Sequence, residues 1–135
     1  MPEESLKEPL LKTPSQDKWL RIGVQKRAGV LAPLFSVYSR KSIGIGEFRD
    51  LKLLIDWAKL SGNSIIQLLP LNEVGIFSCP YDSISSFALE PSYISLEEIP
   101  GIDKNLIKAR IKQLRKEFPV PKSHVDYRIK KRKLE

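Results

Sequence analysis

Hydrophobic positions in the first half of the chain form two short apolar runs on either side of one helical pattern. The runs are 28–35, which contains Gly29 and Pro33, and 65–71; both are too short for a helix and predict buried strands. Between them, Phe48, Leu51 and Ala58 recur at helical spacing, with Gly62 at the C-terminal stop. Strand, helix and strand within about 40 residues predict a βαβ unit with parallel strands.

The second half of the chain has a different pattern. Residues 72–86 are rich in Ser, Pro and Gly and predict a long loop. The run 103–118 has apolar residues on one helical face, and Asp126 precedes a further helix start as a cap. The fold class expected is therefore α/β. Residues 1–27, polar and with three prolines, are expected to be a leader or linker.

Composition narrows the class of protein. The 135 residues are 41% hydrophobic and 29% charged, which is typical of a globular chain. No apolar run reaches the roughly 20 residues that span a bilayer, and the first residues are not a secretory signal, so a cytoplasmic protein without a membrane partner is expected. A single cysteine and a single histidine exclude an intrachain disulfide and a Cys/His-rich metal site; we expect neither a metal nor a cofactor.

Positive charge is concentrated at the C-terminal end. Residues 103–135 contain twelve Lys/Arg and four Asp/Glu, whereas residues 1–102 are nearly balanced. The basic segment carries no known nucleic-acid-binding motif and few aromatic residues, so nucleic acid is not an expected partner. The simpler interpretation is a solvated helix face followed by a frayed basic end.

Candidate chemistry lies in the loops that follow the two predicted strands, because ligands of α/β folds bind at the C-terminal ends of parallel strands. These loops are 36–46 and 72–86. In the second, Tyr81 follows Pro80 and offers a stacking surface for a sugar or a base. A tyrosine packed under its own loop explains the same spacing equally well.

Other candidate residues have simpler structural explanations. The Gly44–Gly46 pair lacks the spacing of a phosphate-binding loop and is better explained as a turn into the helix. Cys79 is expected to be a buried thiol instead of a nucleophile, and His124 a surface residue. Asp82 and Glu90 are eight positions apart, a spacing that does not by itself support an acid/base pair.

Several segments, taken together and in order, resemble the opening of the 4-alpha-glucanotransferases, the amylomaltase or disproportionating-enzyme family. They are AGVL (28–31), GIGEF (44–48), QLLPLN (67–72), PYDSISSFA (80–88) and VDY (125–127). Each is weak alone, but their order and spacing are specific. The resemblance covers residues 28–127, most of the chain.

The resemblance implies a partial (β/α)8 TIM barrel: the first two β/α units plus a helical insertion over residues 28–127, followed by a truncated basic tail over 128–135. Such enzymes cut an α-1,4 bond, hold a covalent glucosyl intermediate and transfer the glycan to a sugar 4-hydroxyl. Their three catalytic carboxylates lie on later barrel strands, so no catalytic residue is expected in this chain. The expected partners are maltooligosaccharides and, in trans, the rest of the barrel.

The resemblance also assigns site residues. Tyr81 matches the family's active-site tyrosine, and Ser78 and Pro80 lie where the family shapes that loop. Glu90 stands where many members have Asn, Asp82 where many have Gln, and Ile66 where many have Trp. These departures leave the sugar contacts of the loop open. The alternative to an inactive enzyme fragment is a non-catalytic module that binds glycans through the Tyr81 loop or anions through the basic end.

Overall fold

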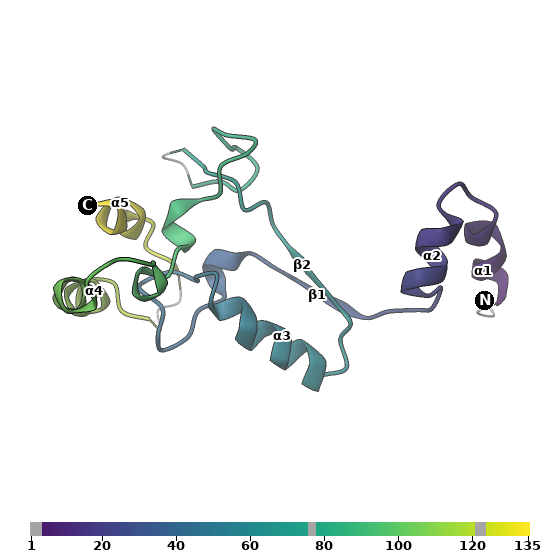
Figure 1. The fold of residues 1–135 in the computed structure, drawn as a ribbon, viewed down its shortest axis with the longest axis horizontal. Coiled ribbons are helices and arrows are strands. Elements are labelled where there is room, and N and C mark those ends of the chain that lie inside the picture. Colours follow the sequence, from purple (N-terminus) through teal and green to yellow (C-terminus); the bar gives the residue numbers. More distant parts are fainter. Residues whose placement is uncertain (1–3, 76–77, 121–123) are drawn as a thin grey trace.

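Two parallel strands and one connecting helix form the centre of the molecule (Figure 1). The computed structural model describes residues 4–75, 78–120 and 124–135. Strand β1 (Gly29–Ala32) pairs with β2 (Ile65–Leu68) from Gly29 opposite Ile65 to Ala32 opposite Leu68. Helix α3 (Asp50–Leu60) lies between them in the chain. The predicted βαβ order with parallel strands is confirmed, although both strands are shorter than the apolar runs that indicated them.

The start of α3 is fixed by the Asp50 carboxylate. Its Oδ2 accepts hydrogen bonds from the Glu47 backbone N–H at 2.8 Å and from the Ser42 hydroxyl at 2.7 Å. The Glu47 carbonyl accepts in return from the Asp50 N–H at 2.9 Å, so the two residues close a turn directly before the helix. The contacts tie α3 to the buried turn over residues 42–47 that precedes it.

Gly44 and Gly46 allow that turn to pack tightly. Gly44 has φ +72°, and a Cβ at this position would come within 2.7 Å of Phe118. A Cβ at Gly46 would lie 1.9 Å from the Leu34 carbonyl oxygen. The expectation that these glycines turn the chain into the helix is confirmed: a side chain would meet neighbouring side chains at Gly44 and the backbone at Gly46.

The hydrophobic core lies beside the strands, not between them. Helix α4 (Lys104–Glu117) begins at the Asp103 cap, whose carboxylate accepts from the Asn105 N–H at 2.8 Å. Helix α5 (Arg128–Leu134) closes the core from the C-terminal side. The core residues come from five segments: Leu34, Ile43, Ile45, Tyr93, Ile111, Leu114, Phe118 and Ile129.

The expectation of a frayed basic end is wrong. In α5, Ile129 is fully buried and Lys133 is nearly so. The Lys133 ammonium donates to Glu47 Oε1 at 3.0 Å and to the carbonyl oxygens of Ser92 at 2.7 Å and Ile94 at 2.8 Å. Because these partners lie 39 to 86 positions away, the C-terminal helix is part of the folded core. Where a domain of the whole protein begins and ends stays a prediction.

Two helices that the hydrophobic pattern did not predict precede β1. Helix α1 (Glu4–Leu11) contains Pro9, and α2 (Gln16–Ile22) has only seven residues. They lie against each other at the end of the molecule opposite α4 and α5 (Figure 1). The segment expected to be a leader or linker is thus partly helical.

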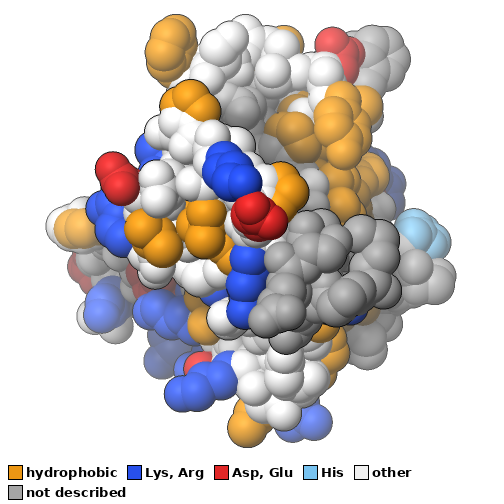
Figure 2. Space-filling view, turned by 90° about the vertical axis from the view of Figure 1, so that its right-hand side faces the viewer, with side chains coloured by type: hydrophobic (Ala, Val, Ile, Leu, Met, Phe, Trp, Pro, Cys, Tyr) orange, Lys and Arg blue, Asp and Glu red, His pale blue; other side chains and the backbone are white. Residues whose placement is uncertain are grey.

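Large hydrophobic side chains are exposed on and around the strands. One face of the β1–β2 pair leaves Leu31 59% and Ile65 46% exposed. Four further residues of α3 are also exposed: Leu53, Ile55, Trp57 and Leu60. The view from the α1–α2 end likewise shows hydrophobic side chains among the charged ones (Figure 2). Across the described residues no third strand joins the pair, so both sheet edges are open, and no helix is long and apolar enough to cross a membrane.

Candidate functional site

The loop that follows β2 is organised as an irregular antiparallel pair. Asn72 bridges Leu89 and Val74 bridges Ser83. Backbone hydrogen bonds from Glu73 to Ala88 and from Ile84 to Glu73, at 2.8 and 2.9 Å, hold the two sides together. The loop lies beyond the C-terminal end of β2, on the side of the molecule away from α1 and α2 (Figure 1). This is the end at which α/β folds bind ligands.

Tyr81 lies at the tip of this loop with 73% of its surface exposed. Of the two alternatives left open by the sequence, a ring packed under its own loop does not occur. Pro80 and Ser78 are half-buried beside it, and Ser78 is the one non-glycine residue among those described with a positive φ, 51°. The structure therefore brings the three sequence-predicted site residues together in one turn, with the aromatic ring facing solvent.

Glu90 anchors the base of the same loop. It is 2% exposed, and its carboxylate accepts from the N–H groups of Val74 and Ser92, each at 3.1 Å. Lys130 of α5 donates to Glu90 Oε2 at 2.8 Å and to the Val74 carbonyl at 2.5 Å. Burial raises the pKa of Glu90, but the Lys130 ammonium and the N–H donors outweigh it and hold that pKa below its usual value. A charged carboxylate thus joins the loop to the C-terminal helix.

The remaining candidates do not form a catalytic group. Asp82 is exposed near the tip whereas Glu90 is buried at the base, so they do not face a common space as an acid/base pair. Cys79 is exposed, which corrects the expectation of a buried thiol. His124 is exposed, as expected. The part of the chain that the structure describes holds no group of three His, Cys, Asp or Glu side chains able to bind a metal ion.

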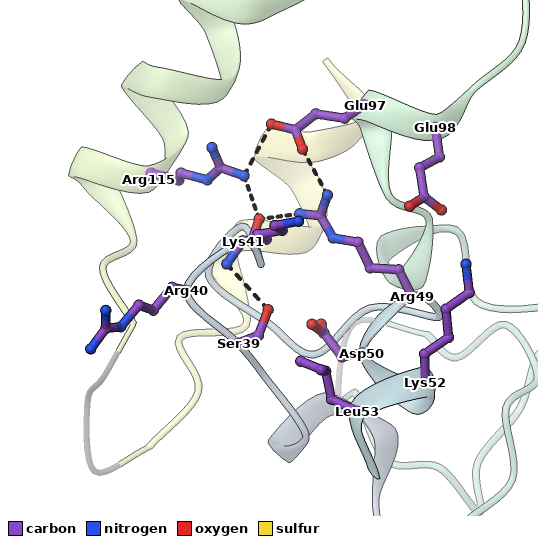
Figure 3. Close-up of a pocket in the computed structure, with 10 residues that line it drawn as sticks. All are labelled: Ser39, Arg40, Lys41, Arg49, Asp50, Lys52, Leu53, Glu97, Glu98 and Arg115. Atoms are coloured by element: carbon purple, nitrogen blue, oxygen red, sulfur yellow. Dashed lines mark hydrogen bonds and ion pairs between the residues drawn. The ribbon is translucent and has the colours of Figure 1, made fainter. Parts of the chain in front are cut away.

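A second feature is a pocket of about 820 Å³ lined by residues of the β1–α3 loop, α3, the 3-10 turn Leu96–Glu98 and α4. Glu97 is one of the lining residues and pairs with Arg49 at 2.7 Å and with Arg115 at 3.1 Å. Figure 3 shows both guanidinium groups directed at Glu97 and at the Lys41 carbonyl oxygen, which each of them also contacts. Through these contacts the two arginines link the β1–α3 loop and the start of α3 to α4.

The two arginines of this pocket stabilise the ionised form of the Glu97 carboxylate. The Arg49 guanidinium, and with it Arg115, holds the pKa of Glu97 below its usual value despite partial burial. Arg49 is 48 positions from Glu97 in the chain, and Arg115 is 18 positions from it. No motif or periodicity marks these three residues in the sequence, because the cluster forms only when the chain folds.

Comparison with known proteins connects this arrangement to one family. A sequence profile described as 4-alpha-glucanotransferase matches residues 32–134. The 4-alpha-glucanotransferase of Chlamydia pneumoniae is 50% identical over 91 residues, which are 67% of this chain and 17% of that protein. That of Chlamydia trachomatis serovar D is 39% identical over 109 residues, 80% of this chain and 21% of that protein.

A plant relative gives the same result. The protein named 4-alpha-glucanotransferase DPE2 of Oryza sativa subsp. japonica is 41% identical over 116 residues, 82% of this chain and 12% of that protein. The chain thus spans about a fifth or less of the length of these relatives. The profile match extends from the end of β1 through α5 and includes the Tyr81 loop and the Glu97 pocket. This chain belongs to the 4-alpha-glucanotransferase family, glycoside hydrolase family 77.

Proposed function

We propose that this chain is the N-terminal part of a (β/α)8-barrel 4-alpha-glucanotransferase and is inactive alone. The profile match over residues 32–134 is the observation that carries the proposal. The parallel β1–β2 pair supports it, because further parallel strands can join both open edges and a complete barrel needs roughly 250 residues. In this proposal the exposed face of the pair and the apolar side of α3 are covered by the rest of the barrel, supplied in cis or in trans.

The proposed reaction is transfer of an α-1,4-glucan segment to a sugar 4-hydroxyl with retention of configuration. In the first step a carboxylate attacks the anomeric carbon while a carboxylic acid protonates the leaving oxygen. In the second step the acceptor hydroxyl displaces the first carboxylate from the anomeric carbon and gives its proton back to the group that had acted as the acid. The two carboxyl groups must lie about 5 Å apart. Asp82 and Glu90 do not serve as this pair, since one is exposed and the other holds Lys130, so the catalytic groups belong to later strands.

In the same proposal Tyr81 stacks on a glucose ring, and Ser78 and Pro80 shape the loop around it. An exposed ring at the C-terminal end of a barrel strand offers an apolar face to the C–H side of a sugar. Glu90 and Lys130 keep the loop in place without contacting the sugar, because both are used at its base. Glu90, which stands where many family members have Asn, therefore gives the loop an ion pair with Lys130.

The test replaces the matching 109-residue segment of the Chlamydia trachomatis relative with the corresponding residues of this chain. We expect the chimera to disproportionate maltotriose with release of glucose, while the isolated 135-residue chain releases none. In the chimera, Tyr81→Ala should lower the rate about tenfold through loss of stacking, whereas Tyr81→Phe, which keeps the ring, should change it little.

Two results would contradict the proposal. One is a chimera that folds, as judged by a cooperative thermal transition, and yet does not act on maltotriose. The other is glucose release by the isolated chain, which would place a complete catalytic centre within these 135 residues. Equal activity of Tyr81→Ala and the parent chimera would remove the stacking role alone and leave the rest of the proposal standing.

A further inference from the structure

Helix α4 carries a row of lysines without counter-charges. Lys104, Lys108, Lys112 and Lys116 occupy every fourth position of the helix and are all exposed. None of the four ammonium groups has a hydrogen bond or an ion pair with any described residue. The helix contains six basic residues and a single acidic one, Glu117, which pairs with Arg132 of α5. The row is therefore an area of positive charge that the folded chain itself does not neutralise.

The geometry of the row is that of a linear charge array. Residues four apart on a helix are neighbours about 6 Å apart, and successive pairs form a ridge inclined to the helix axis. From Lys104 to Lys116 the row extends about 18 Å at 1.5 Å per residue. The opposite face of α4, with Ile111 and Leu114, is packed in the core. The lysines are thus held on a rigid element with one side open to solvent.

Such a row is unfavourable for the helix itself. Lysines at i and i+4 repel each other, whereas an acidic partner at i+3 or i+4 would stabilise the helix and serve solubility equally well. No Asp or Glu lies three or four positions from any of the four lysines in α4. A ligand with anionic groups spaced along a flexible chain would remove this repulsion, because each ammonium is a strong point donor to phosphate.

We propose that the lysine row of α4 binds phosphate groups carried by a phosphorylated α-glucan. The inference rests on the proposed function, in which the chain belongs to an enzyme that acts on α-glucans. Nucleic acid is less well suited, because α4 has no aromatic side chain on which a base can stack. A membrane is also less well suited, because the apolar face of α4 is buried and Leu106 is its only exposed large hydrophobic side chain.

The experiment measures binding of the 135-residue chain to a fluorescent maltodextrin, with and without phosphate monoesters, at several salt concentrations. Lys108→Gln with Lys112→Gln removes the centre of the row. Lys18→Gln with Lys59→Gln removes two exposed lysines outside α4 and serves as the control with the same net charge. All four positions are exposed, so both variants should keep the far-ultraviolet circular dichroism spectrum of the parent.

We expect the parent and the control to prefer the phosphorylated dextrin. The row variant should bind it about tenfold more weakly, and its affinity should fall less steeply with salt concentration than that of the parent. The inference would be overturned if the parent bound both dextrins with equal affinity, or if the row variant and the control lost the same amount of affinity. It would also be overturned if the parent bound duplex DNA or phosphatidylserine vesicles more tightly than the phosphorylated dextrin. Failure of the proposed function would appear separately, as an inactive chimera on unphosphorylated maltotriose.

Discussion

Lys133 shows how much one charged residue contributes to this core. An ammonium group has three donors, and here each one meets an oxygen: the Glu47 carboxylate and the carbonyls of Ser92 and Ile94. Burial lowers the pKa of Lys133, and the Glu47 carboxylate offsets part of that effect. The group is accommodated because its hydrogen bonds are complete, and removal of Lys133 takes from the buried Glu47 carboxylate one of its two cationic partners.

Replacement of this lysine should therefore be costly. Lys133→Ala leaves the buried Glu47 carboxylate with only Arg49 and the Ile43 N–H as partners among the described residues, and we expect the free energy of unfolding to fall by about 3 kcal/mol. Urea unfolding followed by circular dichroism measures the change. Lys131→Ala, two positions earlier on the same helix but exposed, is the matched control and should stay within about 0.5 kcal/mol of the parent. Similar losses in the two variants would show that the buried contacts of Lys133 are not important.

At the scale of elements, ionised carboxylates connect segments that are distant in the chain. Glu90 ties the loop after β2 to α5, and Glu97 ties the β1–α3 loop and α3 to α4. Both have pKa values lowered from 4.5 in the folded chain. Below about pH 4.5 the unfolded chain binds more protons than the folded one. The stabilisation is therefore complete above that pH and is lost as the pH falls through the folded pKa values.

We expect the urea midpoint of the parent chain to drop between pH 7 and pH 3. Glu90→Gln should be less stable at pH 7 but should show a smaller drop, because its amide cannot be protonated in this range. Glu98→Gln, which removes an exposed carboxylate beside Glu97, should keep the drop of the parent. A midpoint in the Glu90→Gln variant that depends on pH as strongly as in the parent would rule out this role of Glu90.

The elements with strong periodicity were the ones that the sequence predicted. The βαβ order, α3 and α4 follow from apolar spacing, and the end of α3 follows from Gly62, whereas the Asp103 cap of α4 was not predicted. Helices α1 and α2 were missed because Pro9 and a seven-residue length hide them in a polar segment. The place of α5 was missed because burial of Lys133 depends on Glu47, which is 86 positions away.

Part of the candidate site could likewise be predicted from the sequence, and part could not. The turn of Ser78, Pro80 and Tyr81 is local, so its position after a strand could be predicted from sequence order. The exposure of Tyr81 could not, because it depends on how far the loop leans away from the core. The Glu97 cluster joins three separate segments and gives no local signal at all.

At the scale of the whole molecule, the strand pair is the most open part. Leu31 and Ile65 lie on one exposed face, and both strands have unpaired edges among the described residues. Exposed edges and apolar faces of this kind favour association with another chain. Isolated copies of this chain are therefore expected to associate with each other when no other barrel segment covers the strands.

This association can be measured by sedimentation velocity over a concentration series. The parent chain should sediment faster as its concentration rises, and Leu31→Lys with Ile65→Lys should keep it monomeric by placing charges on the exposed face. Leu20→Lys, at an exposed position of α2 away from the strands, should associate like the parent. A parent chain that is monomeric at every concentration would contradict the expectation.

The burial of Ile129 and Lys133 in the core has a consequence for biosynthesis. A ribosome adds roughly 5–20 residues per second, so Leu34, Ile43 and Glu47 emerge several seconds before the helix that covers them. During that interval the growing chain exposes apolar core residues that α5 covers only later. Nascent chains of this protein are thus expected to need a chaperone until residue 133 has left the exit tunnel.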